Sequence, residues 1–168
     1  SDETCIKNMF RFIKTNNLFS QVFIRYGYLR FCVLKYKKIQ KGVAMENTKP
    51  IIELELYIIR HGQSMGNIER NTDGLSITDL HDPRLTELGK KQAITCGERF
   101  KNTEFDAVYS SALLRAVETA TEIIKKQPSE KTLKVLPLLT EAGISEEYSH
   151  SSFDEINKIN KNAVLADD

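Results

Sequence analysis

The sequence predicts an α/β fold of three layers, in which helices cover both faces of a mostly parallel β-sheet. The first observation is an apolar run over 51–59 that alternates with polar residues at strand spacing. The second is a pair of stretches, 86–100 and 110–126, with apolar residues at helical spacing. The third is a short apolar run after each stretch, at 105–109 and 133–136. This order of strands and helices is typical of a parallel sheet.

Length and charge indicate one globular domain with an extension. The chain has 168 residues, 40% of them hydrophobic, which is enough for a single core. Its net charge of +1 combines two segments: residues 1–44 hold nine Lys and Arg against two acids, and residues 45–168 hold fifteen against twenty-one. The polar stretch 45–50 marks the change. We therefore predict a basic, partly amphipathic extension over 1–44 and an acidic folded domain over 45–168.

Three cysteines, Cys5, Cys32 and Cys96, are an odd number without Cys-x-x-Cys spacing. Neither a disulfide framework nor a zinc ribbon is predicted, and a reducing cytoplasm is favoured. No group of acids and histidines has ligand spacing, so we expect no metal. The acidic charge of 45–168 does not favour nucleic acid as a partner.

The apolar stretch over 18–36 is the part of the extension that could contact a membrane. Three basic residues interrupt it, which excludes a spanning helix of about 20 apolar residues. Five residues close to helical spacing predict a basic amphipathic helix: Phe19, Val22, Phe23, Tyr26 and Val33. This helix either packs on the rest of the domain or lies on an anionic membrane surface, and the first alternative is favoured because such faces usually face a core.

The predicted elements continue in order after residue 50. The first strand ends at Ile59, directly before Arg60, His61 and Gly62, and the polar stretch 66–83 predicts a long loop that covers a pocket. Thr86 is expected to cap the first helix, which buries four residues on one side: Leu88, Ala93, Gly97 and Phe100.

Ser110 or Ser111 is expected to cap the second helix. The apolar stripe of this helix consists of Leu113, Ala116, Val117, Ala120, Ile123 and Ile124. After the strand at 133–136, a loop carries Glu141. The stretch 152–165 predicts the start of a further helix whose packing partners are absent from the chain.

One histidine and two arginines are candidates for a single pocket, because ligands of such sheets bind beyond the carboxyl ends of the strands. His61 follows the first strand, and Arg115 lies near the start of the second helix, where the helix dipole favours an anion. A neutral imidazole can attack phosphorus, and guanidinium groups of Arg60 and Arg115 can hold a phosphoryl group through forked hydrogen bonds. The pattern predicts phosphoryl transfer through a phosphohistidine.

On four segments the chain resembles the histidine phosphatase superfamily, whose fold is phosphoglycerate mutase-like. The resemblance extends from residue 51 to about 148. Its first two segments are Arg-His-Gly-x-Ser-x-x-Asn within 56–67 and Asp-Pro-Arg-Leu-Thr-Glu-Leu-Gly within 82–93. The other two are Arg-Ala-x-Glu-Thr within 108–119 and Leu-Thr-Glu at 139–141. Arg-His-Gly alone is a weak signal, but four segments in the family's order are a strong one.

The resemblance implies a role for each matching residue. His61 corresponds to the nucleophile, and Arg60 and Arg115 correspond to the phosphate clamp. Asn67 corresponds to a polar ligand of the phosphate, and Gly62 lets the backbone approach the anion. Two alternatives remain open: an arginine of the clamp pairs with a carboxylate such as that of Glu118, and Asn67 is a turn or cap residue.

Glu141 corresponds to the acid that protonates the leaving oxygen. The residues after it depart from the family's pattern, which usually includes a tryptophan. Glu146 or Glu147 could therefore be the acid instead, and the alternative is that all three glutamates form a solvated face.

The resemblance also implies a second histidine near the end of the domain, in a strand followed by His-Gly. Neither His81 nor His150 fits this context, because no apolar strand precedes either residue. We therefore expect the fold to be C-terminally incomplete.

The activity expected from the resemblance is hydrolysis of a small phosphomonoester, without a cofactor. The first alternative is a non-catalytic short member that binds phosphorylated ligands or partners through Arg60 and Arg115. The second is phosphoryl transfer of the phosphoglycerate mutase type, which the absence of tryptophan disfavours. The oligomeric state is not predicted.

Overall fold

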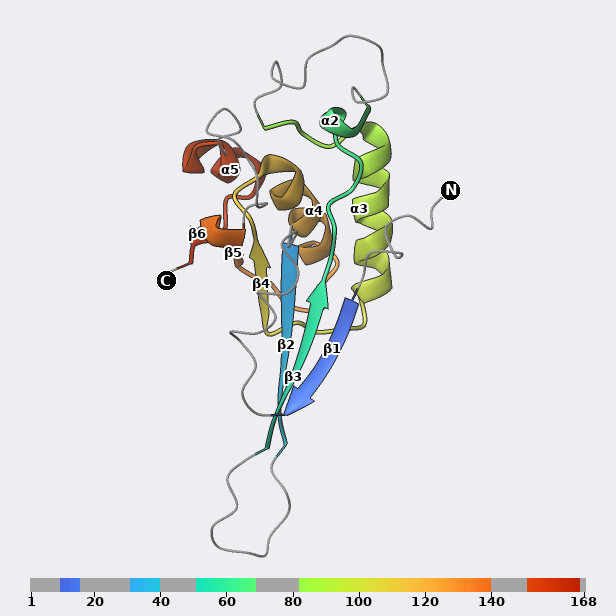
Figure 1. Ribbon diagram of the computed structural model, residues 1–168, viewed down its shortest axis with the longest axis vertical. Coiled ribbons are helices and arrows are strands. Elements are labelled where there is room, and N and C mark those ends of the chain that lie inside the picture. The colour runs from blue at the N-terminus through green and yellow to red at the C-terminus, as the bar shows by residue number, and fades with distance from the viewer. Residues whose placement is uncertain (1–9, 16–30, 40–50, 69–81, 140–150, 167–168) are drawn as a thin grey trace, which may run out of the picture.

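The computed structural model describes residues 10–15, 31–39, 51–68, 82–139 and 151–166 (Figure 1). The six strands are β1 (Phe10–Thr15), β2 (Phe31–Ile39), β3 (Ile51–Ile58), β4 (Ala107–Ser110), β5 (Leu133–Val135) and β6 (Ala163–Leu165). The helices are α2 (Met65–Ile68), α3 (Glu87–Phe100), α4 (Leu114–Ile124), the 3-10 turn η4 (Pro137–Leu139) and α5 (Phe153–Ile159).

All six strands belong to one sheet, in the order β1-β3-β2-β4-β5-β6. The pairs β4–β5 and β5–β6 are parallel. Strand β2 is antiparallel to both β3 and β4, so β3 runs in the same direction as the three parallel strands. The carboxyl ends of β3 and β4 therefore point to the same edge of the sheet, as the sequence predicts, and the α/β class is confirmed.

Two strands of this sheet come from the predicted extension. Strand β1 pairs with β3, and β2 lies between β3 and β4, with Cys32 opposite both Ile58 and Tyr109. The amphipathic helix predicted through Val33 is wrong at that residue, which lies in β2; the rest of the predicted helix lies outside the described residues. The division of the chain at residue 44 remains a prediction.

The main core lies between the sheet and the packed helices α3, α4 and α5 (Figure 1). Tyr57 and Ile59 face it from β3 and the turn that follows, and Phe100 and Phe105 stack edge-on around the Tyr57 ring. The alternate residues of β3, Leu56 and Ile58, form a smaller cluster with other apolar residues, Leu139, Tyr109 and Leu136. The strand spacing read from the sequence thus sorts side chains onto two faces.

Helix α3 begins as predicted. The Thr86 hydroxyl accepts a hydrogen bond from the Gly89 backbone N–H at 3.0 Å, which satisfies one donor of the first turn. Ala93, Gly97 and Phe100 are buried. The prediction that Leu88 is buried is wrong, since this residue is 48% exposed. Five residues correspond to about 500° of helix, so Leu88 lies well away from the face that Ala93 defines.

Helix α4 does not begin at the predicted cap. Ser110 is the last residue of β4, and the chain needs residues 111–113 to turn before the helix can start. The N-cap position is taken by Leu113, whose side chain cannot cap. The predicted apolar stripe is confirmed at Ala116, Val117, Ala120 and Ile123, which are buried. Of its other two members, Leu113 precedes the helix and Ile124 is partly buried.

The segment 152–165 is helical over only half of its length. Helix α5 starts with a capping box between Ser152 and Glu155, and it ends at Ile159, with Asn160 as its C-cap. The Ser152 backbone N–H lowers the pKa of the Glu155 carboxyl, so the stabilisation from this hydrogen bond is present where Glu155 is ionised and is lost as the pH falls through that lowered pKa. Residues 163–165 instead form β6. The prediction that this segment lacks packing partners is wrong for Ile156, which is 1% exposed in the main core.

A Gly89→Ala substitution is expected to destabilise the fold. Alanine normally favours a helix interior by about 1 kcal/mol relative to glycine. Here an added Cβ would lie 2.0 Å from the Gln63 carbonyl oxygen, so overpacking of about 2 kcal/mol or more should outweigh that gain. Chemical denaturation would measure the loss, with Lys91→Ala on the exposed face of the same helix as control. Unchanged or increased stability of Gly89→Ala would contradict the packing described here.

Candidate active site

The turn after β3 holds His61 in one tautomer. The imidazole is buried, with Nδ1 2.6 Å from the Gly62 carbonyl oxygen and Nε2 3.2 Å from Nε of Arg115. A carbonyl oxygen only accepts hydrogen bonds, and a guanidinium only donates them. Nδ1 therefore carries the proton and Nε2 carries the lone pair. This neutral tautomer directs a nucleophilic nitrogen toward the guanidinium of Arg115.

Arg115 is the second residue of α4 and is 5% exposed. Besides its contact with His61, its Nη1 lies 3.7 Å from Oδ1 of Asp82. The alternative that a clamp arginine pairs with a carboxylate therefore holds for Arg115, but its partner is Asp82 and not Glu118. Glu118 instead pairs with Arg84, whose Nε and Nη2 each lie 2.7 Å from Oε1.

Thr119 connects the histidine turn to α4, and the sequence analysis did not identify it. Its hydroxyl donates to the Arg115 carbonyl oxygen at 2.8 Å and accepts from the Gly62 backbone N–H at 3.2 Å. The signal for this role was its position one helical turn after Arg115, because residues four apart lie on the same face.

Gly62 is required by close packing of the backbone. An added Cβ at Gly62 would lie 2.4 Å from the Gly89 carbonyl oxygen, so only glycine lets the histidine turn rest on the first turn of α3. The contact is extended by hydrogen bonds from the Thr86 N–H to the Gln63 carbonyl and from the Gln63 N–H to Gln92. The predicted role of Gly62, a close approach to an anion, remains a prediction beside this observed one.

Two predicted phosphate ligands lie near His61 along the chain. Arg60 is exposed at the end of β3, directly before the histidine. The Asn67 side-chain oxygen accepts from the backbone N–H and the hydroxyl of Ser64, at 3.0 and 3.1 Å. Asn67 thus has the turn-forming contacts that were the alternative to a ligand role. The predicted acid Glu141, its alternatives Glu146 and Glu147, and both remaining histidines lie outside the described residues.

Asp82 is the second residue that the sequence analysis missed, although it begins one of the four matching segments. Its side chain is fully buried, and both carboxylate oxygens lie 3.1 Å from the Leu114 backbone N–H. We expected the amino end of α4 to attract an anion. In the folded chain this end already faces an anion, the carboxylate of Asp82, so Arg115 provides its charge through its side chain alone.

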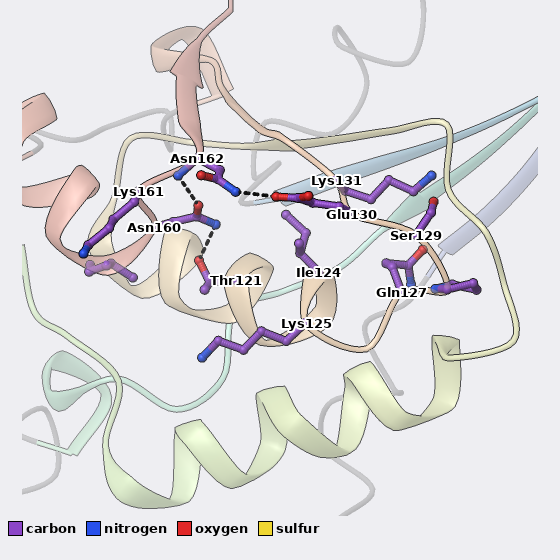
Figure 2. Close-up of a pocket in the computed structure, with 12 residues that line it drawn as sticks. Thr121, Ile124, Lys125, Gln127, Ser129, Glu130, Lys131, Asn160, Lys161 and Asn162 are labelled. Atoms are coloured by element: carbon purple, nitrogen blue, oxygen red, sulfur yellow. Dashed lines mark hydrogen bonds between the residues drawn. The ribbon is translucent and has the colours of Figure 1, made fainter.

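A hollow of about 410 Å³ lies at the opposite end of α4 (Figure 2). Three lysines contribute to its lining: Lys125, Lys131 and Lys161. Lys125 is paired with Glu122 at 2.6 Å and Lys131 with Glu104 at 3.2 Å, so most of this charge is already balanced. The buried residues around His61 are therefore the better candidate for a phosphate site.

The residues that the structure describes include neither a metal site nor a membrane-spanning helix. No group of three or more His, Cys, Asp or Glu side chains is arranged to hold a metal ion. No helix there is long and apolar enough to cross a membrane.

Comparison with known proteins gives a family match over residues that include His61 and Arg115. The family model described as histidine phosphatase superfamily (branch 1) matches residues 56–167. A 2,3-bisphosphoglycerate-dependent phosphoglycerate mutase of Bartonella henselae is 34% identical over 116 residues, which are 67% of this chain and 50% of that protein. The fructose-2,6-bisphosphatase TIGAR of Xenopus laevis is 36% identical over 81 residues, which are 48% of this chain and 28% of that protein.

The chain spans about half the length of the curated phosphoglycerate mutases that it matches first. No solved structure gives a significant match. The family match covers most of the chain, from the middle of β3 to the residues after β6, and it includes His61 and Arg115. The chain is therefore a member of the histidine phosphatase superfamily.

Proposed function

We propose that the protein hydrolyses small phosphomonoesters through a phosphohistidine on His61. The observation that carries this proposal is the contact between Nε2 of His61 and Nε of Arg115, in which the nucleophilic lone pair and a cation face the same point. A phosphoryl group placed there would meet both the nitrogen that attacks it and the donor that neutralises it.

The proposed reaction has two steps. In the first, Nε2 attacks phosphorus, the bond from phosphorus to the ester oxygen breaks, and the leaving oxygen takes a proton from Glu141. In the second, a water molecule attacks the phosphohistidine, Glu141 takes a proton from it, and the bond between nitrogen and phosphorus breaks. Inorganic phosphate leaves, and His61 returns to the neutral tautomer that the hydrogen bond to Gly62 favours.

Arg115 and Arg60 are proposed to balance the charge on the phosphoryl oxygens during both steps. Arg115 is pre-oriented by its burial, whereas Arg60 is exposed and would reach the substrate from the rim. When substrate binds, the Nε–H of Arg115 would exchange His61 for a phosphoryl oxygen, which frees the lone pair for attack.

A mutase is the second candidate, favoured by the identity to the bisphosphoglycerate-dependent enzymes. In that case the phosphohistidine would transfer its phosphoryl group to a phosphoglycerate instead of water. Incubating the protein with 2,3-bisphosphoglycerate or fructose 2,6-bisphosphate, with and without phosphoglycerate, would separate the two. Release of inorganic phosphate without an acceptor supports hydrolysis, and formation of product only with the acceptor supports the mutase.

A third candidate is a binding protein without turnover. Titration with inorganic phosphate, followed by a turnover assay on the same preparation, distinguishes it from an enzyme. Saturable binding together with no release of phosphate from any ester would favour the binding protein.

His61 is expected to carry the covalent phosphate. After a brief incubation with a labelled phosphomonoester and a rapid quench, the label should be stable to base and labile to acid, and peptide mapping should place it on His61. The His61→Ala variant should take up no label. Label on a serine or an aspartate, or full turnover by His61→Ala, would contradict the mechanism.

Arg115→Lys is expected to lower kcat/KM at least about tenfold, which corresponds to about 1.4 kcal/mol. The planar guanidinium contacts His61 and Asp82 at once. Lysine keeps the charge but lacks the forked geometry for both contacts. Steady-state kinetics would measure the loss, and Arg99→Lys on the exposed surface of α3 serves as control. An unchanged kcat/KM for Arg115→Lys would remove this residue from the proposed site.

The role of Glu141 predicts a dependence on the leaving group. Glu141→Gln should slow hydrolysis of an alkyl phosphate much more than that of p-nitrophenyl phosphate, because nitrophenolate leaves without a proton. Glu146→Gln and Glu147→Gln are the matched controls. If either control shows this selectivity and Glu141→Gln does not, the acid is that other glutamate.

A further inference from the structure

Asp82 contacts three parts of the chain with one carboxylate. Its oxygens accept from the backbone N–H of Leu114, the first residue of α4, and Oδ2 also accepts from the Ser151 N–H at 3.0 Å. Oδ1 forms the ion pair with Arg115 at 3.7 Å. The side chain is 0% exposed, and that of Arg115 is 6% exposed. Asp82 therefore joins the start of α4, the buried arginine and the segment that leads into α5.

The backbone of Asp82 is held in an uncommon conformation. Its φ is 49°, and among the described residues it is the non-glycine residue with positive φ. Aspartate tolerates this region better than most residues, but the conformation still costs on the order of 1 kcal/mol. The hydrogen bonds that the Asp82 carboxylate accepts offset this cost and hold the strained backbone in place.

The ion pair explains how a guanidinium can be buried beside a neutral imidazole. A buried cation without a nearby anion is strongly disfavoured, and His61 supplies no charge in the tautomer that its contacts require. Asp82 supplies the negative charge on one side of the guanidinium. An incoming anion would meet the side of the guanidinium that contacts His61.

We propose that Asp82 is the positioning residue of the phosphate site: it holds Arg115 against His61 and couples this arrangement to the docking of the segment that starts at Ser151. The inference rests on the proposed function for the identity of the ligand. It goes beyond that function because it assigns the geometry of the site to a residue that does not touch the substrate, and because it links α5 and β6 to the site.

The substitution Asp82→Asn distinguishes a positioning role from a simple charge effect, because the two change phosphate affinity in opposite directions. Asparagine keeps the shape but removes one negative charge 3.7 Å from the arginine, and on charge alone this change should tighten the binding of an anion. Loss of positioning has the opposite effect. We expect the Kd for inorganic phosphate, measured by calorimetry on the full chain, to rise about tenfold or more.

Nuclear magnetic resonance gives a second measurement that does not require ligand binding. In the unmodified chain the Nε–H of Arg115 and the amides of Leu114 and Ser151 should exchange slowly with solvent. In Asp82→Asn the two amides should exchange faster, because both donate to the Asp82 carboxylate. The Arg115 Nε–H should exchange faster with them, because the guanidinium loses the ion pair that holds this group against His61.

Glu118→Gln is the matched control. Glu118 is also a buried carboxylate that accepts a backbone N–H, from Leu85 at 2.8 Å, and pairs with an arginine, Arg84. Glu118→Gln should lower the melting temperature about as much as Asp82→Asn does. It should leave the phosphate Kd and the three exchange rates nearly unchanged.

The outcomes are separable from those of the proposed function. If the unmodified chain fails to bind phosphate, the phosphate site itself is wrong, and the exchange rates alone decide whether Asp82 positions Arg115. If Asp82→Asn binds phosphate as tightly as the unmodified chain or more tightly, or if its Arg115 Nε–H stays protected, the positioning role is refuted. Equal effects of Glu118→Gln on the three exchange rates would likewise refute it.

Discussion

The site depends on a guanidinium that is almost entirely removed from water. A buried positive charge needs a nearby anion or hydrogen-bond acceptors, and Arg115 has one of each: the carboxylate of Asp82 at 3.7 Å and Nε2 of His61 at 3.2 Å. Two contacts fix the imidazole tautomer: the one with Arg115 and the hydrogen bond to the Gly62 carbonyl. Because each partner limits the others, the position of α4, the rotamer of Arg115 and the protonation of His61 form one cooperative arrangement.

One strand from the predicted basic extension, β2, determines the spacing of this arrangement. Strand β2 separates β3, which leads to His61, from β4, which leads to α4. Neighbouring strands lie about 4.8 Å apart, so β3 and β4 are separated by about 10 Å. A contact across this distance requires the long side chain of an arginine.

Membership of the family and the activity of this chain are separate conclusions. Families of this kind include phosphatases and mutases, as the names of the relatives show, and both types act on small phosphorylated compounds. The described residues include the proposed nucleophile, His61, and the proposed phosphoryl-binding cation, Arg115. The predicted acid, Glu141, lies outside the described residues.

The sequence by itself determined the α/β class, the cap of α3 at Thr86 and the candidates His61 and Arg115, because periodicity, capping and short motifs are local properties. Only the tertiary structure decided which carboxylate meets Arg115, since Glu118 is near in sequence but faces Arg84, whereas Asp82 approaches from 33 positions away. The sequence marked Gly62 as a site residue, but the need for glycine at this position comes from the close contact with the backbone of Gly89 in α3. Val33 could not be assigned from its helical spacing, because pairing of β2 with both neighbouring strands overrode the local pattern. Contacts between distant segments depend on the whole fold, and for that reason no local pattern encodes them.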